Sequence, residues 1–258
     1  MGKVNFRAFL PRLAGAAGKV LLEHYGKTHR VEWKPGAGIV TEADKRAEGV
    51  LLKKIFRKFP KSSIITEESG EYRGEGSLCW VLDPLDGTSN YAHGFPMFCV
   101  SIGLYEDGEA KAAVIYSPVL KEMFYAERGR GAYLNGRPIR VSKTKTVKEA
   151  LLGTGFYYST GAILRQEMKI FFRMNEAALA VRRPGSAALD LAFVACGRYD
   201  GFWERGLSPW DVAAGFLIVK EAGGMFTDYR GKKTDMFGKE VVASNGRIHK
   251  PLVSLMRA

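Results

Sequence analysis

The strongest constraint on the fold is a run of five apolar residues that leads directly into two aspartates. Residues 78–82 read Leu-Cys-Trp-Val-Leu, and the sequence continues as Asp-Pro-Leu-Asp-Gly-Thr, with Asp83 and Asp86 as its acids. A short continuous apolar run is typical of a buried strand. Carboxylates at the end of a buried strand are costly unless cations compensate their charge. The sequence therefore favours a fold in which a cation compensates the charge at the end of this strand.

The segment around these aspartates is acidic, although the whole chain carries a formal net charge of +12. Between residues 67 and 86, Arg73 is the one cation facing six carboxylates. Those carboxylates are Glu67, Glu68, Glu71, Glu75, Asp83 and Asp86. Hard oxygen donors of this kind suit Mg²⁺ or Mn²⁺ rather than zinc. The sequence therefore predicts a Mg²⁺ site, with Mn²⁺ as an alternative ion.

The residues between and after the two aspartates complete a candidate phosphate site. A spacing of three, with a proline that stiffens the turn, lets Asp83 and Asp86 converge on one point. The Leu85 carbonyl can face the same point as a neutral ligand. Gly87 and Thr88 then offer backbone N–H groups where a helix can begin, which suits a phosphate. Metal ligands beside a phosphate cradle are what metal-assisted phosphate hydrolysis requires.

Each of these features also has an ordinary structural explanation. The Asp-Pro-Leu-Asp-Gly sequence could be a plain turn. Asp44 is the third residue after Thr41, a potential helix N-cap, and Asp211 stands in the same relation to Ser208. Glu67 and its neighbour could lie in a solvated loop. Taken singly, none of these residues identifies a site.

The pattern of elements predicts an α+β fold. With 258 residues the chain suits one large domain or two small ones folded together. We predict an N-terminal half, residues 1–145, in which an antiparallel sheet with helices carries most metal ligands. A smaller α/β half, residues 146–258, would carry Asp211 and the substrate contacts. The expected helices lie at 4–25, 42–59, 161–178, 186–197, 209–222 and from 246, and the expected strands at 63–66, 78–82, 98–106, 110–116, 122–127, 150–155, 181–183, 200–204, 225–228 and 241–244.

Composition narrows the class of protein. The positive charge is spread along helical segments with no Arg-rich tail, which favours a solvated basic surface and leaves a nucleic-acid partner as the alternative. The scattered Cys79, Cys99 and Cys196 indicate reduced thiols rather than disulfides or a zinc site. No stretch reaches the roughly 18 apolar residues of a membrane span. The N-terminal apolar run is broken by Pro11 and Arg12, so we expect a cytoplasmic protein.

Four segments, in order along the chain, together resemble the inositol monophosphatase family. They are Thr41-Glu42-Ala43-Asp44, Thr66-Glu67-Glu68-Ser69, Trp80-Val81-Leu82-Asp83-Pro84-Leu85-Asp86-Gly87-Thr88 and Trp210-Asp211-Val212-Ala213-Ala214-Gly215. The resemblance extends through residues 90–96 and 185–190 and covers nearly the whole chain. It implies the layered αβαβα fold of the Mg²⁺-dependent, lithium-sensitive sugar phosphatases.

By this resemblance, the acidic residues divide into two metal sites. Glu67, Asp83 and the Leu85 carbonyl would hold the first Mg²⁺, and Asp83, Asp86 and Asp211 the second. A third, weaker metal in the family leans on the glutamate that matches Glu67. Before Val40 the family often has Asp where this chain has Gly38-Ile39, so residues 33–38 would be more mobile and contacts to the third metal are in doubt.

The resemblance also implies the reaction. Thr88, paired with Asp44, would orient a water for in-line attack, and Glu67 completes the catalytic set. Backbone N–H groups of Gly87 and Thr88 would hold the phosphoryl oxygens. The expected activity is hydrolysis of a phosphate monoester, most simply myo-inositol-1-phosphate, by a homodimer. His93 matches a loop-packing position rather than a catalytic base.

The same resemblance also implies which residues contact the substrate. Glu204, seven residues before Asp211, matches the glutamate that binds inositol hydroxyls. The implied substrate-binding residues are Asp86, Gly87, Thr88, Ser186, Ala187, Glu204, Arg205 and Asp211. Arg183, Arg205 and Arg165 are candidates to reach a second phosphate through charge-assisted hydrogen bonds, or are ordinary surface arginines.

Alternative functions stay open at this point. Fructose-1,6-bisphosphatase or dual activity is one, and NADP or nucleotide phosphatase is a second. Outside the enzyme class, the basic surface could serve a regulatory protein that binds nucleic acid or polymerase. Such binding would weaken steeply with added salt.

Overall fold

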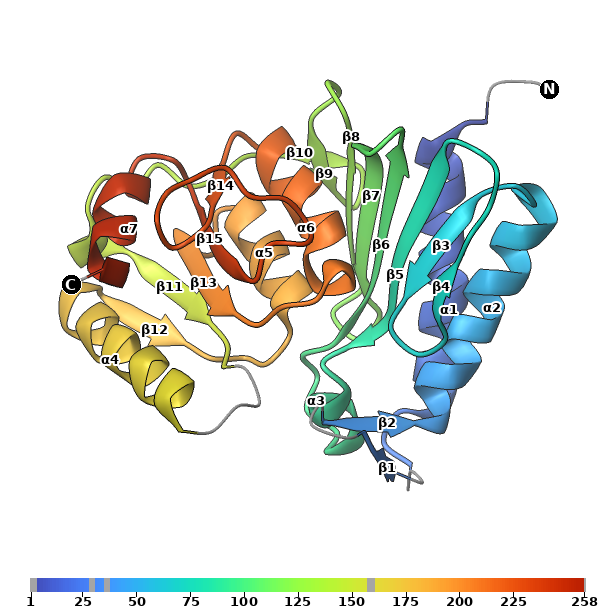
Figure 1. The fold of residues 1–258 in the computed structure, drawn as a ribbon, viewed down its shortest axis with the longest axis horizontal. Helices are drawn as coiled ribbons and strands as arrows, with labels where there is room; N and C mark the ends of the chain where they lie inside the picture. Colours follow the sequence, from blue (N-terminus) through green and yellow to red (C-terminus); the bar gives the residue numbers. More distant parts are fainter. Residues whose placement is uncertain (1–3, 28–30, 35–37, 157–160, 258) are drawn as a thin grey trace.

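The structure is a computed structural model that describes residues 4–27, 31–34, 38–156 and 161–257. Within these residues, helices and sheets stack in five alternating layers (Figure 1). The helices α1 and α2 form one outer layer, and α4 and α7 form the other. The predicted layered αβαβα fold is confirmed.

The larger sheet is built from the first half of the chain. Among the described residues its strand order is β10-β9-β8-β7-β6-β5-β3-β4, and neighbouring strands are antiparallel except for β3 and β5. The predicted hairpin is confirmed, with Asp107 and Gly108 both at positive φ in the turn. The strands are β3 Ser63–Thr66, β4 Gly70–Tyr72, β5 Leu78–Asp86, β6 Cys99–Glu106, β7 Glu109–Ser117, β8 Glu122–Glu127, β9 Ala132–Leu134 and β10 Arg137–Ile139.

Two amphipathic helices cover the outer face of this sheet, α1 (Phe6–His24) and α2 (Glu42–Lys58). They bury Leu13 and Leu51 against a core that contains Trp80 of β5. The helix α2 begins at a capping box made by Thr41 and Asp44, as predicted. A two-stranded hairpin that the pattern did not predict, β1 (Val31–Trp33) with β2 (Ile39–Thr41), leads into it.

The second half of the chain forms a smaller mixed sheet, with strand order β12-β11-β13-β15-β14 in the described residues. Its strands are β11 Leu151–Thr154, β12 Ala180–Arg182, β13 Gly201–Arg205, β14 Met225–Thr227 and β15 Glu240–Ser244. The remaining helices are α3 Thr88–Ala92, α4 Ala162–Ala177, α5 Ala187–Ala195, α6 Pro209–Glu221 and α7 His249–Arg257, with a 3₁₀ turn at Val147–Glu149.

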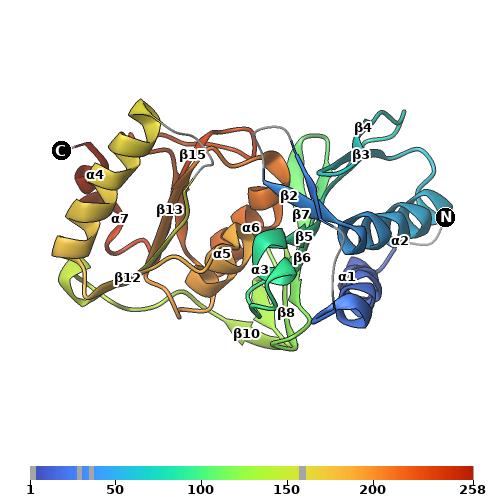
Figure 2. The same ribbon diagram turned by 90° about the horizontal axis from the view of Figure 1, so that it is seen from below.

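The helices α5 and α6 lie between the two sheets (Figure 2). Every residue of α5 is buried, as expected for a helix covered on all sides. One apolar cluster joins Ile115 of the large sheet, Leu191 and Leu217 of these helices, and Phe202 of the small sheet. The division at residue 145 into two domains stays a prediction. Within the described residues, no helix has the length and apolar composition that crossing a bilayer requires.

The strand β5 is longer than predicted, and the difference sets the geometry of the site. The apolar run predicts a strand that ends at Leu82, with the aspartates in a turn, but β5 continues through Asp86. Its pairing with β6 joins Asp83 to Ser101 and Asp86 to Cys99, so β5 holds one extra residue, a β-bulge. In a regular strand, residues three apart point to opposite faces. The bulge allows both aspartates to face the same side.

Candidate active site

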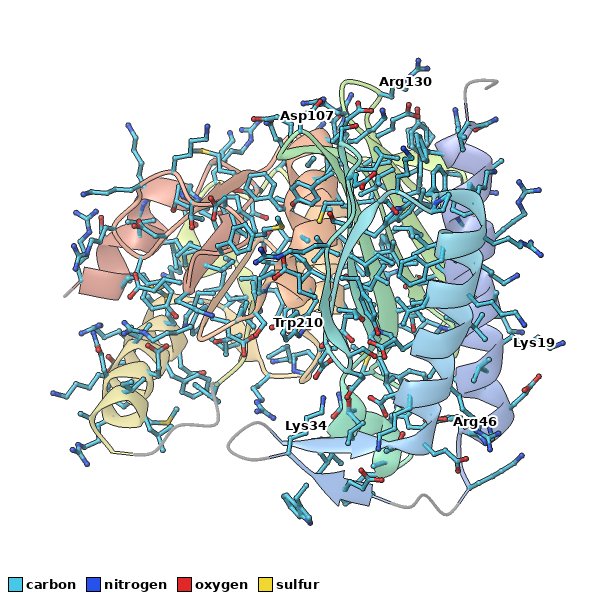
Figure 3. All side chains as sticks on the ribbon, turned by 45° about the vertical axis from the view of Figure 1, so that its right-hand side comes forward. Lys19, Lys34, Arg46, Asp107, Arg130 and Trp210 are labelled. Carbon is cyan, nitrogen blue, oxygen red and sulfur yellow. The ribbon has the colours of Figure 1, made fainter. Side chains whose placement is uncertain are left out.

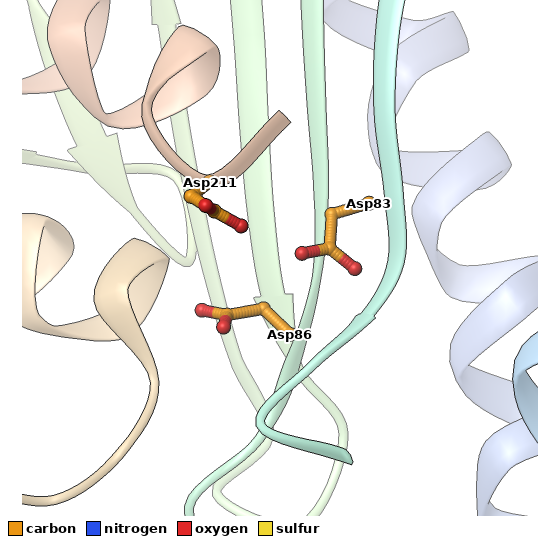
Figure 4. A group of neighbouring side chains, drawn as sticks. All are labelled: Asp83, Asp86 and Asp211. Carbon is orange, nitrogen blue, oxygen red and sulfur yellow. The ribbon is translucent and has the colours of Figure 1, made fainter. Parts of the chain in front are cut away.

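Three aspartates from distant parts of the chain meet at the end of β5 (Figure 4). Asp83 and Asp86 come from β5, and Asp211 comes from the first turn of α6. One carboxylate oxygen from each lies within 4.8 Å of the other two. The structure therefore brings together three of the predicted metal ligands.

The electrostatics of this cluster favour a bound cation. Burial raises the pKa of Asp83 and of Asp211 well above the usual range, and neighbouring carboxylates raise both further. Burial also raises the pKa of Asp86 to about 6. Groups this close resist ionising together unless positive charge compensates them. Because the donors are hard oxygens, the residues present fit a divalent ion of the Mg²⁺ type.

Asp211 and Asp44 are fixed by the helices they cap. One oxygen of Asp211 accepts the backbone N–H of Ser208 at 2.6 Å, and one oxygen of Asp44 accepts that of Thr41 at 2.9 Å. The structural explanation of both residues as caps is therefore correct. It does not exclude the functional one, because the cap leaves the second oxygen of each carboxylate for another partner.

Asp86 is held from the second half of the chain. Its Oδ2 accepts hydrogen bonds from the Ser186 hydroxyl at 2.7 Å and from the Ala188 backbone N–H at 2.8 Å. Both donors belong to the start of α5, where backbone N–H groups have no partner within the helix. The carboxylate that faces the cluster thus links the large sheet to α5.

Lys34, which directly follows β1 (Figure 3), is a charged neighbour that the sequence analysis missed. Its ammonium lies 2.8 Å from Glu67 Oε1 and 2.7 Å from Glu68 Oε1. Burial lowers the pKa of Lys34, but the two glutamates raise it by more, so the lysine stays charged. No local signal identifies it, because the contact depends on the β1–β2 hairpin. The sequence predicts that residues 33–38 are more mobile. Residues 35–37 lie outside the described residues, so this stays a prediction.

The predicted water-orienting pair is in contact. The Thr88 hydroxyl lies 3.0 Å from Asp44 Oδ1 and 3.0 Å from the Leu85 carbonyl oxygen, and it can donate its proton to either. Burial raises the pKa of Asp44 to about 6. Gly87 precedes this pair with φ of +91°, and a Cβ there would lie 2.7 Å from the Met97 carbonyl oxygen. Only glycine fits this turn without strain.

These residues line one cavity between the two halves of the chain. Most of the predicted site residues contribute to its wall, Arg183 among them, and so do Ser89, Gly155 and Phe156. Asp44 is absent from the wall and is linked to it by the hydrogen bond from Thr88. The other predicted residues in the wall are Glu67, Asp83, Leu85, Asp86, Gly87, Thr88, Ser186, Ala187, Glu204 and Asp211.

Arg205 does not line this cavity. Adjacent residues of a strand point to opposite faces, so Glu204 faces the site and Arg205 faces away. Its guanidinium pairs with Glu167 at 2.8 Å and with Glu240 at 3.0 Å. The predicted contact between Arg205 and substrate has no support in this geometry. Arg165 and His93 are exposed and lie outside the cavity wall.

Comparison with known proteins identifies the family. The sequence matches the inositol monophosphatase family model over residues 4–258. The chain belongs to the inositol monophosphatase family. The resemblance of the four acidic segments is thereby confirmed, and so is the expectation of an enzyme.

Curated relatives of this inositol monophosphatase family member carry different names. The inositol-1-monophosphatase of Synechocystis sp. is 44% identical over 94% of this chain and 85% of its own length. The fructose-1,6-bisphosphatase/inositol-1-monophosphatase of Thermotoga maritima is 41% identical over 96% and 94%. The Nus factor SuhB of Salmonella typhimurium is 42% identical over 95% and 93%. Family membership alone therefore does not fix the substrate.

The fold has well-matched solved counterparts. The crystal structure of the extragenic suppressor protein suhB from Bartonella henselae superposes with a TM-score of 0.92 at 38% sequence identity. The match covers 96% of both chains. The whole layered architecture, and not one half of it, is shared.

Proposed function

We propose that this protein is a Mg²⁺-dependent phosphatase of phosphate monoesters and that myo-inositol-1-phosphate is a substrate. The observation that carries the proposal is the meeting of Asp83, Asp86 and Asp211 beside the hydrogen-bonded pair of Thr88 and Asp44. Metal-holding acids and a polar hydroxyl in one cavity are the components that hydrolysis of a phosphate ester needs.

The side chains have separate roles in this scheme. Asp83 with Glu67 and the Leu85 carbonyl would hold one Mg²⁺, and Asp83, Asp86 and Asp211 would hold a second. Bound Mg²⁺ supplies positive charge to the ester and lowers the pKa of an attacking water. A weaker third ion beside Glu67 belongs to the same proposal.

The water and the ester are oriented by groups next to these acids. The Thr88 hydroxyl donates a hydrogen bond to Asp44 or to the Leu85 carbonyl oxygen. Its own oxygen therefore keeps lone pairs that can accept a hydrogen bond from water. The backbone N–H groups of Gly87 and Thr88 would hold phosphoryl oxygens, while Ser186, Ala187 and Glu204 would contact the substrate ring.

A phosphate-release screen with and without Mg²⁺ tests the proposal. The substrates are inositol-1-phosphate, fructose-1,6-bisphosphate, NADP and 3′-phosphoadenosine phosphate. We expect Mg²⁺-dependent release from inositol-1-phosphate, which Asp83→Asn abolishes and lithium inhibits. An exposed turn acid gives the control, because Asp107→Asn should leave activity unchanged. Absence of Mg²⁺-dependent release from every substrate would rule out the proposal.

Arg183 favours a second phosphate on the substrate. It lines the cavity wall with its guanidinium carbon 5.8 Å from the centre of the Phe156 ring. Planar guanidinium groups bind phosphate through paired hydrogen bonds worth roughly 1.5–3 kcal/mol. We expect Arg183→Ala to reduce kcat/KM for fructose-1,6-bisphosphate about 10-fold more than for inositol-1-phosphate. Equal losses on both substrates would remove this role.

A second candidate function is binding of a nucleic acid, and one surface feature favours it. Arg12, Lys54, Arg57 and Lys58 line a groove between α1 and α2. Within the described residues, Arg12, Lys54 and Arg57 have no acidic partner within ion-pair distance. Relatives of this chain are named Nus factor SuhB, which is a further reason to test this surface. Lys19 and Arg46 belong to the same two helices and do have acidic partners (Figure 3).

Salt dependence tests this second candidate. A short single-stranded RNA should bind more weakly as salt rises, with a log–log slope that decreases by roughly 0.7 for each phosphate contact removed. The double variant Lys54→Ala with Arg57→Ala should therefore flatten the slope, whereas Asp83→Asn should not. RNA that fails to bind at low salt, or an unchanged slope, would count against it.

The homodimer and the cytoplasmic location also belong to the proposal. Both rest on the resemblance and on the sequence rather than on geometry. Light scattering of the purified chain would give the oligomeric state directly.

A further inference from the structure

We propose that Glu48 is a positioning residue for the first metal site, and this inference rests on the phosphatase function proposed above. Glu48 belongs to α2 and is 4% exposed. It does not line the cavity described above. Its task is to hold the turn that presents Glu67.

The carboxylate of Glu48 binds both ends of that turn. Its Oε1 accepts hydrogen bonds from the Thr66 hydroxyl at 2.6 Å and from the Ser69 backbone N–H at 3.1 Å. Its Oε2 accepts a hydrogen bond from the Ser69 hydroxyl. Thr66 and Ser69 flank Glu67 and Glu68, so one side chain clamps the segment from both sides.

The turn needs such an anchor because it carries like charges. It joins β3 to β4 between the paired residues Thr66 and Gly70. Glu67 lies in the cavity wall, and its charge raises the pKa of Asp83, so the two repel. Lys34 neutralises part of this charge through hydrogen bonds to the side chains of the two glutamates, which do not hold the backbone of the turn. Repulsion would move the turn away from the aspartates if its backbone were not fixed.

Burying an acidic side chain at position 48 costs free energy unless hydrogen bonds compensate for the lost solvent. Within the described residues, the carboxyl group of Glu48 is buried and has no ion-pair partner. Three donors converge on it, and hydrogen bonds to a charged acceptor are about twice as strong as neutral ones. A glutamine would present an NH₂ group to at least one of these donors.

The helix α2 links this clamp to the water-orienting pair. Glu48 lies one helical turn beyond Asp44, so both side chains leave the same face of α2. Asp44 contacts Thr88, while Glu48 contacts the turn that holds Glu67. One rigid helix thereby sets the distance between the predicted water position and the first metal site.

The test is calorimetric binding of Mg²⁺ to Glu48→Gln, without substrate. Loss of a group that supports a metal ligand typically reduces metal affinity about 10–100-fold. We expect the Mg²⁺ site at Glu67 to weaken by that factor, while a second site, at the three aspartates, keeps its affinity. In turnover, the Mg²⁺ concentration for half-maximal rate should rise by a similar factor, with the substrate KM at saturating Mg²⁺ unchanged.

A matched control lies on the same helix. Glu42 is exposed and pairs with Arg46, so Glu42→Gln should bind Mg²⁺ as the wild type does. If Glu48→Gln does not fold, Thr66→Val combined with Ser69→Ala removes two of the donors and keeps the acid; it should show the same weakening.

The outcomes separate this inference from the proposed function. A folded Glu48→Gln, or a folded double variant, with Mg²⁺ affinity within twofold of wild type would overturn the positioning role alone. A wild type that takes up no Mg²⁺ and releases no phosphate would instead remove the proposed function.

Discussion

At the scale of single residues, Asp44 and Asp211 each serve two purposes with one carboxylate. One oxygen caps a helix, and the pairing fixes the side chain in one orientation. The second oxygen of Asp44 then meets Thr88, and Asp211 joins the other two aspartates. The capping hydrogen bond of each residue therefore orients its carboxylate toward the candidate site.

Two substitutions of Asp211 separate these roles. Asp211→Asn keeps an oxygen for the Ser208 N–H, so its free energy of unfolding should match the wild type or exceed it. Asp211→Ala also loses the cap, which costs about 0.5–2 kcal/mol. Metal contributions of several kcal/mol imply that both variants lose at least roughly 100-fold in kcat/KM. Chemical denaturation and phosphate release measure the two effects, and near-normal activity of Asp211→Asn would contradict the ligand assignment.

At the scale of elements, two irregularities of the backbone position the residues of the candidate site. The bulge in β5 sets Asp83 and Asp86 on one side, and the left-handed Gly87 then turns the chain into α3. A regular strand followed by an ordinary helix would separate the aspartates from Thr88. The irregular backbone is therefore what brings the proposed metal ligands next to the hydroxyl proposed to orient water.

Gly87→Ala tests the second irregularity. The left-handed conformation costs a residue with a Cβ about 1–2 kcal/mol, and contact with Met97 adds to this. Gly94→Ala is the matched control, since Gly94 also has positive φ but its added Cβ meets no atom within 4 Å. We expect Gly87→Ala to be the less stable of the two in urea and to lose activity by displacing Thr88. Equal stability and activity of the two variants would contradict this account.

At the scale of the molecule, acidic charge is concentrated where the two halves of the chain meet. Burial raises the pKa of Asp44 and Asp86 to about 6 and that of Glu68 to about 7. The folded chain therefore holds protons that the unfolded chain has already released. By linkage, these groups reduce stability as pH rises from about 4 to about 7. Burial lowers the pKa of His249, which acts with the opposite sign.

Thermal melting at two pH values tests this balance. In EDTA, we expect a lower Tm at pH 7.5 than at pH 5, because each unit of raised pKa costs about 1.4 kcal/mol per group. Mg²⁺ should raise the Tm more at pH 7.5, since the ligands must be deprotonated to bind it. A metal-free Tm that rises across this interval would show that the acidic cluster does not dominate.

Much of the fold and the site could be predicted from the sequence, because the relevant signals are local. Apolar periodicity, capping residues and turn glycines fixed most helices and strands to within a few residues. The three-residue strands β1, β2, β4, β9 and β10 were missed, since so short a segment has no measurable period. The acidic motifs, each a short contiguous segment, identified Glu67, Asp83, Asp86 and Asp211, which line the cavity.

What the sequence by itself determined was which residues could bind a metal and which segments are helical or extended. Only the tertiary structure decided which way side chains point. It turned Arg205 away from the cavity, placed Lys34 against Glu67, and set Glu48 beneath the turn. These contacts join residues from different elements, and their geometry depends on how the layers pack. No pattern within one segment carries that information.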